Sequence, residues 1–385
     1  MVRIIVVTDS GCEDAAAIEI QRWLDAVPTK ERNIVIVEGT IEDAALLGYR
    51  LQTARRVLIE IIPCCNSLSV LKMQVPDTAL LQQLIAQNTT FKVEADILCM
   101  ALDGTAQESP FLTQELVEEI GGWASKQLFM KANLSRPDVV LYTVAVVEKD
   151  NLKIVVGVDV IGTSLPKRDW RIIVGRRGLK STVAAAAAIY ALQNNTRHLL
   201  DPLADDGMLV IEAALFVTRT SPRLFQKEFA FQKFPATKDW KKILETKRKK
   251  EEITIEGYVN TMRDLKAIRT NAKLAGIEKS IHATKITVDW MDIKKEESVI
   301  DCIITAPIPS GRAVTLEQAA KMNDQLFYQV EYVLKKGKTM TCITEKPTEL
   351  MAPAEKFCFT IIEQRPVLVG KRPMTIVTFK NTKQQ

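Results

Sequence analysis

Short β-branched segments alternate with helical segments along this chain, which predicts an α/β fold ending in a doubly wound parallel sheet. A length of 385 residues allows two or three domains at about 100–200 residues each. Hydrophobic residues make up 47% of the chain and charged residues 26%, an ordinary globular balance. The chain therefore has enough apolar side chains for more than one core.

The N-terminal part predicts a small α/β unit of ferredoxin-like type, because strands and helices alternate within about 60 residues. Strands are expected at 3–8, 33–37 and 57–62, with helices at 12–24 and 42–53. Pro63 is expected to stop the third strand, since proline has no N–H to donate to a sheet.

The segment from about Asp77 to Trp170 predicts a second α/β unit. Helices are expected at 80–86 and 113–126, and strands at 91–100, 139–147 and 153–159. The polar residues 148–151 join the last two strands as a hairpin turn.

The pattern changes after Gly178, where longer helices alternate with apolar strands. An alanine-rich helix is expected at 181–193, followed by helices at 264–275 and 316–334 and strands at 253–258, 286–289, 299–305 and 339–344. This alternation is typical of a doubly wound parallel sheet. The strands at 358–363 and 374–379 predict a closing antiparallel hairpin.

Composition narrows the function. The 52 Lys and Arg residues exceed the 47 Asp and Glu residues, and a net charge of +5 is compatible with a nucleic-acid partner without requiring one. The two histidines, His198 and His282, make a histidine-rich metal site improbable. Seven cysteines without a Cys-x-x-Cys pair indicate a reducing compartment and no zinc site. Cys64 and Cys65 are either a redox pair or two buried small side chains.

No segment predicts a membrane anchor. The apolar N-terminal run is too short for a secretory signal, and the longest apolar run, Val183–Leu192, is too short to span a bilayer. We therefore expect a soluble, cytoplasmic protein with no membrane partner and no structural metal. The most polar stretch, Lys238–Glu252, has seven basic and four acidic residues and is either a solvated connector or an arm that touches RNA.

Five segments, in order, carry a resemblance to THUMP-containing RNA methyltransferases. They are Tyr49–Ile59, the junction Thr163–Arg171 with Leu179–Ala185, Leu200–Leu215, Ala267–Gly276 and Ile300–Arg312. The third resembles the family's first cofactor motif, LDPFCGSGTILIEAAL, and the last resembles DVIVTNPPYGER. The most similar members of the family methylate guanine N2 in tRNA or ribosomal RNA with S-adenosylmethionine.

The resemblance implies four parts of the chain. These are a ferredoxin-like domain at 1–65, a THUMP RNA-binding domain at 66–165, a basic linker at 166–180 and a Rossmann-like methyltransferase domain at 181–385. In the family, a glycine-rich loop holds the cofactor's carboxylate at a helix N-terminus. Here Asp201, Pro202 and Gly207 match that loop, but Asp205 replaces a glycine.

The remaining loop residues also depart from the family. Asp206 replaces the serine and Met208 the threonine, so two carboxylates would face the cofactor's own carboxylate. The residues Asp205, Asp206 and Gly207 are better read as a structural turn in which Asp206 caps the next helix.

Two further family devices are altered. The acidic residue that binds the ribose falls on Val259, with Asn260 as a partial substitute. Asp289 matches an acid that contacts the adenine amine, or it caps a turn. In the family, the Asn-Pro-Pro-Tyr motif accepts hydrogen bonds from the target amine, and its aromatic ring stacks on the base. The corresponding residues here are Ala306, Pro307, Ile308 and Pro309.

The basic junction is the best candidate for an RNA contact, because guanidinium groups bind phosphate and an indole can stack on a base. Its residues are Lys167, Arg168, Trp170, Arg171, Arg176, Arg177 and Lys180. The alternative is a solvated linker in which Trp170 anchors a core.

Three functions stay open at this point. The first is a catalytically silent protein that binds structured RNA, tRNA or rRNA, with poor binding of S-adenosylmethionine and a role as a scaffold beside a protein partner. The second is an active guanine-N2 methyltransferase with an atypical site, in which Asp289 and the Pro307 backbone remain engaged. The third is a protein–protein scaffold that no longer binds RNA.

Overall fold

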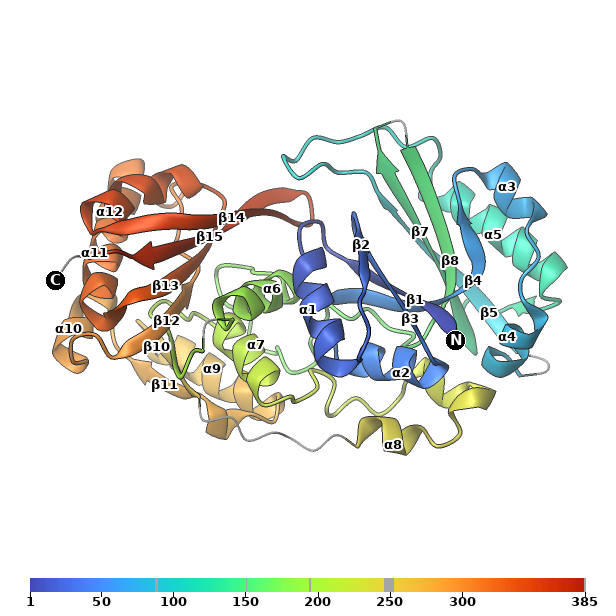
Figure 1. Cartoon of the computed structure of the whole chain (residues 1–385), viewed down its shortest axis with the longest axis horizontal. Coiled ribbons are helices and arrows are strands. Elements are labelled where there is room, and N and C mark those ends of the chain that lie inside the picture. Colours follow the sequence, from blue (N-terminus) through green and yellow to red (C-terminus); the bar gives the residue numbers. More distant parts are fainter. Residues whose placement is uncertain (87–88, 150, 194, 246–252, 384–385) are drawn as a thin grey trace. The chain divides into compact units, whose positions relative to one another are not determined.

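A computed structural model describes residues 1–86, 89–149, 151–193, 195–245 and 253–383 (Figure 1). The chain forms two compact units. The first contains Met1–Pro166 and Gln226–Lys247, and the second contains Lys167–Phe225 and Arg248–Gln385.

Among the described residues, the first unit is built on one sheet of eight strands. In spatial order these are β2 (Thr29–Glu31), β3 (Ile34–Gly39), β1 (Val2–Thr8), β4 (Ala54–Cys65), β8 (Asn151–Asp159), β7 (Val139–Glu148), β5 (Thr90–Leu98) and β6 (Lys131–Ala132). The helices are α1 (Glu13–Trp23), α2 (Ile41–Arg50), α3 (Leu68–Met73), α4 (Thr78–Leu84), α5 (Thr113–Gln127) and α8 (Trp240–Leu244).

This sheet joins the two predicted N-terminal segments, since β4 pairs antiparallel with β8. The prediction that Pro63 stops the third strand is wrong, because β4 continues to Cys65. The β4–β8 register shifts between Ile62 and Cys65, and Pro63 lies within that irregularity, where a missing N–H interrupts no regular ladder. The predicted hairpin of β7 and β8 is confirmed.

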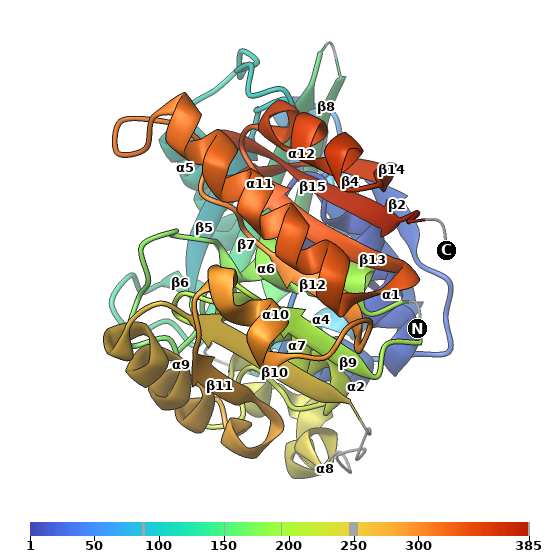
Figure 2. The same cartoon turned by 90° about the vertical axis from the view of Figure 1, so that its left-hand side faces the viewer.

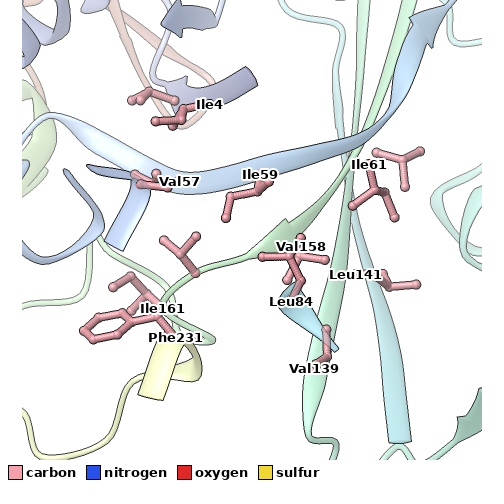
Figure 3. Close-up of a cluster of buried hydrophobic side chains, with 14 of the residues drawn as sticks. Ile4, Val57, Ile59, Ile61, Leu84, Val139, Leu141, Val158, Ile161 and Phe231 are labelled. Carbon is pink, nitrogen blue, oxygen red and sulfur yellow. The ribbon is translucent and has the colours of Figure 1, made fainter. Parts of the chain in front are cut away.

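The sheet is apolar on both faces. Along β1, Ile4 and Val6 belong to the main core, whereas Ile5 and Val7 belong to a smaller cluster, as expected when successive side chains point to opposite faces. Figure 3 shows part of the main core, where Phe231 lies beside Ile161. Phe231 comes from the inserted segment 226–245, which joins this unit because its phenylalanines are buried in this core.

The described part of the second unit has one sheet of seven strands. In spatial order these are β11 (His282–Lys285), β10 (Thr254–Val259), β9 (His198–Asp201), β12 (Ile300–Thr305), β13 (Leu334–Thr344), β15 (Arg372–Asn381) and β14 (Phe359–Val369). The first five are parallel, and β15 and β14 close the sheet as an antiparallel hairpin.

Helices cover both faces of this sheet, which confirms the Rossmann-like, doubly wound prediction. α6 (Ser181–Ala191), α7 (Met208–Val217) and α9 (Met262–Leu274) cover one face. α10 (Met291–Lys294), α11 (Leu316–Val333) and α12 (Met351–Lys356) lie over the other, with α11 crossing in front of β12 and β13 in Figure 2. The strand predicted at 286–289 is wrong, since β11 ends at Lys285 and Val288–Trp290 forms a 3₁₀ turn.

The charged stretch 238–252 is only partly described by the structure. Of the charged stretch 238–252, residues 240–244 form α8, and 246–252 lie outside the described residues. Across the described helices, none combines the length and the apolar character that crossing a membrane requires.

Candidate functional site

The candidate site lies at the carboxyl ends of β9, β10 and β12. The chain runs from β9 through β10 to β11 in one direction and returns to β12 on the other side of β9. In doubly wound sheets ligands bind at such a point of reversal. The structure brings together the predicted loops after Asp201, Val259 and Thr305, which line two adjoining cavities.

The loop after β9 forms a tight turn into α7. Gly207 has a φ of 85°, a left-handed conformation that favours glycine, and it is the N-cap of α7. The prediction that Asp206 caps this helix is therefore off by one residue. An oxygen of Asp206 still accepts a hydrogen bond from Met208 N at 3.3 Å, so the carboxylate occupies the helix N-terminus where the family holds an anionic ligand.

A segment at residues 171–180, which we call the strap, binds both carboxylates of this loop. Arg171 Nε lies 2.7 Å from Asp206 Oδ2, and Gly175 N donates to the same oxygen at 3.0 Å. Arg177 N donates to Asp205 Oδ2 at 3.1 Å. The two aspartates that replace the family's glycine and serine are thus bound within the chain.

Close packing fixes the strap. A Cβ added to Gly175 would lie 2.2 Å from Asp205 Oδ2, so any side chain here requires the Asp205 carboxylate to move. On the other side, the buried Asn271 of α9 donates from Nδ2 to Ile173 O at 2.9 Å and to Asp206 O at 3.1 Å. Asn271 Oδ1 accepts from Ile173 N at 3.2 Å.

The Arg177 guanidinium reaches across the cleft to the third motif. Arg177 Nη1 donates to the carbonyl oxygen of Ala306. Burial lowers the pKa of Arg177, and the charges of Asp201, Asp205 and Asp206 oppose that shift. A backbone acceptor at the position of the family's Asn-Pro-Pro-Tyr motif is therefore used by the protein itself.

Asp201 ends β9 and is buried. Burial raises its pKa to about 6, although Arg177 and a hydrogen bond from Leu203 N, at 3.0 Å, act in the opposite direction. At neutral pH the carboxylate is mostly ionised and adds to the negative charge that Arg177 neutralises.

The cavities left by this arrangement are small. One of about 10 Å³ lies between the strap and the loop after β9, and it holds about one water molecule. A second, of about 120 Å³, is lined in part by Arg176, Tyr258, Asn260 and Ile308. Pockets for ligands of cofactor size usually hold about 300–1,000 Å³. The residues present therefore do not fit S-adenosylmethionine in this arrangement.

The other predicted cofactor and base positions have mixed environments. Pro202, Val259, Ala306 and Pro307 are buried, whereas Asn260, Asp289 and Ile308 are exposed and Pro309 is partly exposed. Asn260 and Ile308 line the 120 Å³ cavity. The Asp289 backbone carbonyl accepts a hydrogen bond from Gln329 at 3.3 Å. The four positions 306–309 carry no aromatic ring that could stack on a base.

The basic junction separates into three environments. Arg168 and Trp170 are buried, and Arg168 pairs with the buried Glu212 at 2.8 Å, so we revise their predicted role from RNA contact to structural support. Arg171 and Arg177 bind the cleft loops, as described above. Lys167 and Arg176 are exposed, and Lys180 is partly exposed at the start of α6.

Sequence reasoning missed three residues that build this site. Gly175 and Asn271 were given no role, and Arg177 was expected to face RNA. A polar amide on the apolar face of the predicted helix at 264–275 was the available signal for Asn271. The described residues contain no group of three or more His, Cys, Asp or Glu side chains arranged to hold a metal.

Fold and site together define a protein of the methyltransferase fold with a filled cleft. The model of the RMKL-like methyltransferase domain matches residues 168–373, and the chain belongs to this family. The ribosomal RNA large subunit methyltransferase K/L of Vibrio cholerae is 29% identical over 197 residues, which cover 48% of this chain and 27% of that protein.

Its counterpart in Vibrio parahaemolyticus is 32% identical over 157 residues, 38% of this chain and 21% of that protein. The matched segments thus span about a quarter of these relatives. Among solved structures, a possible methylase from Clostridium difficile is 19% identical with a TM-score of 0.76, covering 100% of this chain and 99% of that one.

Two further structures share the fold over nearly the full chain. SMU.472, crystallised as a complex with S-adenosylhomocysteine, is 18% identical with a TM-score of 0.74, covering 100% of this chain and 99% of that one. TrmN from Thermus thermophilus is 16% identical with a TM-score of 0.69, covering 99% of this chain and 100% of that one. At these identities the likeness establishes the fold alone.

Proposed function

We propose that the protein is a catalytically silent member of its family that binds structured RNA, tRNA or rRNA, in the cytoplasm as an RNA-associated factor or scaffold. The proposal includes a ferredoxin-like domain at 1–65, a THUMP domain at 66–165 and a basic linker at 166–180. The observation that carries it is the hydrogen bond from Arg177 to the Ala306 carbonyl, which places the protein's own cation in the cleft.

Silence follows from the chemistry of methyl transfer. Transfer to an exocyclic amine needs a donor held in line with a nitrogen whose lone pair is oriented by acceptors. The side-chain acceptor is absent at Ala306, and its carbonyl is engaged by Arg177. Loss of one oriented polar group in other active sites lowers the rate by roughly 10²–10³. A cleft without room for the donor lowers it further.

RNA binding is supported by exposed basic side chains and by the names of similar proteins. Lys167 and Arg176 are exposed, and Arg176 lines the 120 Å³ cavity of the cleft, where a cation can bind phosphate. The relatives in Vibrio are named as methyltransferases of ribosomal RNA. Contacts of this kind are shape- and backbone-directed, so affinity should fall as salt rises.

The alternative is an active guanine-N2 methyltransferase whose strap opens before the cofactor binds. The exposed Asp289 and the strand scaffold favour this alternative, because both survive in the positions that the family uses. In that case S-adenosylmethionine is the donor.

A paired assay separates the two. The protein is incubated with total cellular RNA and tritiated S-adenosylmethionine, and RNA retention on filters is measured in parallel. We expect RNA retention that weakens with salt and no label in the RNA. Label above a no-enzyme blank would establish the active alternative, and no retention at any salt would leave the third hypothesis, a protein scaffold.

A further inference from the structure

The loop after α5 presents an aromatic side chain to solvent in a disfavoured backbone conformation. Phe129 is 90% exposed, and its φ of 53° is left-handed, a region that glycine usually occupies at the end of a helix. An exposed ring gains nothing from burial, and a bulky residue in this region is an outlier. Stability of the fold therefore does not account for phenylalanine at this position.

An apolar cavity adjoins this ring. Its volume is about 360 Å³, within the range of pockets that hold small ligands. Phe129, Leu128 and Met130 form one wall, and residues of the loop before α4 and of α4 itself form the other. None of the described residues that line the cavity is charged.

The loop before α4 is fixed at its base, so this wall is defined. Trp123 Nε1 of α5 donates to Gln74 O at 3.1 Å. The Asp77 side chain caps α4 by accepting from Ala79 N at 2.9 Å. Thr78, Gln82 and Gln127 add hydroxyl and amide groups to a lining that is otherwise mostly apolar. Such groups can hydrogen-bond to the edge of a planar heterocycle.

Three exposed lysines lie close to lining residues of the cavity or to α4, and one exposed carboxylate, Asp77, lies between the lining residues Pro76 and Thr78. Lys126 and Lys131 lie three residues before and two residues after Phe129, and both are exposed. The inserted segment adds to this side, because the 3₁₀ turn Pro235–Thr237 packs against α4 and the exposed Lys238 follows it directly.

We propose that this cavity binds an unpaired nucleotide of RNA, with its base stacked on Phe129 and its backbone phosphates near Lys126, Lys131 and Lys238. An apolar cavity with an exposed ring and flanking cations has the composition of single-strand binding sites, which combine stacking platforms with basic surroundings. A purely apolar peptide would leave the lysines without a partner. The inference rests on the proposed function and specifies where unpaired RNA is held.

The test uses the full chain, a fluorescein-labelled oligoadenylate and a blunt RNA duplex of similar length. Phe129→Ala should weaken binding of oligoadenylate about five- to a hundredfold, the range for loss of one base–aromatic stack. Phe129→Trp should keep the affinity within about threefold, since indole also stacks. Binding of the blunt duplex should change less than about twofold for either variant.

Controls separate the proposals and guard against misfolding. Phe225→Ala removes a ring that is 65% exposed in the second unit and should leave oligoadenylate binding unchanged. Lys126→Gln with Lys131→Gln should flatten the salt dependence without affecting the fold, as checked by circular dichroism. If RNA binds but Phe129→Ala has no effect, or a neutral apolar peptide competes fully with oligoadenylate, this inference is overturned and the proposed function stands. If neither RNA binds, both are overturned.

Discussion

Two concave regions among the described residues differ in what fills them. At the carboxyl ends of β9, β10 and β12, charged side chains from the strap and the loop after β9 bind one another and leave two cavities of about 10 and about 120 Å³. Beside α4 and α5, an apolar cavity of about 360 Å³ stays open next to an exposed ring. In the first region the charged groups bind other groups of the same chain. In the second region the apolar lining stays exposed and is available to a partner. We therefore expect an unpaired nucleotide to bind in the first unit rather than in the cleft of the second.

The largest expected effect comes from the buried ion pair between Arg168 and Glu212. Arg168→Ala should lower the free energy of unfolding by about 3–5 kcal/mol, because it removes the buried guanidinium that neutralises the charge of Glu212. Chemical denaturation of the purified protein measures this. Arg176→Ala is the matched control, since this exposed arginine should contribute less than about 0.5 kcal/mol. Equal effects for the two variants would contradict a structural role for Arg168.

A cluster of charged side chains around Glu256 of β10 and His198 of β9 allows a test by pH. Burial alone would raise the pKa of Glu256, but hydrogen bonds from His198 and Lys295, both at 2.6 Å, bring it down to about 2. A depressed pKa stabilises the folded state above the unfolded value of about 4.5, and this contribution is lost as pH falls toward 2.

Glu256→Gln should thus cost at most about 3 kcal/mol at pH 7. The difference from the wild type should shrink between about pH 4.5 and pH 2. Urea unfolding at several pH values measures this, with Asp324→Asn, from an exposed pair with Lys356, as the control. A constant difference across this range would show that the cluster does not hold the carboxylate ionised.

The smallest expected effect concerns the open pocket. Phe129→Gly should raise the free energy of unfolding by about 1 kcal/mol, because glycine adopts a left-handed φ without the penalty of a Cβ. Phe129→Ala keeps the Cβ and should stay near the wild type. Thermal unfolding of both variants checks this, and a loss of stability for Phe129→Gly would mean that the ring supports the fold.

Burial explains which elements could be predicted from the sequence. The strands at 3–8 and 299–305 and the helix at 316–334 are confirmed within a residue or two, because their apolar spacing reflects a buried face. The strand predicted at 286–289 lies instead at His282–Lys285. Its position could not be predicted, because His282, Thr284 and Lys285 are exposed and carry no apolar pattern. The placement of 226–245 depends on a core formed by distant residues, which no local pattern encodes.

The position of the site could be predicted from the sequence, but its hydrogen bonds and ion pairs could not. The loops after β9 and β12 were located by their likeness to family motifs, and the substituted residues Asp205, Asp206 and Ala306 were recognised as departures. The strap could not be foreseen, because Arg171 and Arg177 look like any exposed basic pair until the carboxylates they bind are brought close by the fold. When the partner of a charged side chain is distant in sequence, the local sequence does not show that this side chain will be buried.

Calorimetric titration of S-adenosylmethionine into the protein of residues 1–385 tests the closed cleft most directly. We expect no saturable heat up to millimolar ligand, and the same result with Asp205→Gly alone, because Arg171 and Gly175 still hold the strap to Asp206. Saturable binding with a micromolar dissociation constant in the wild type would show that the cleft opens and would contradict the account.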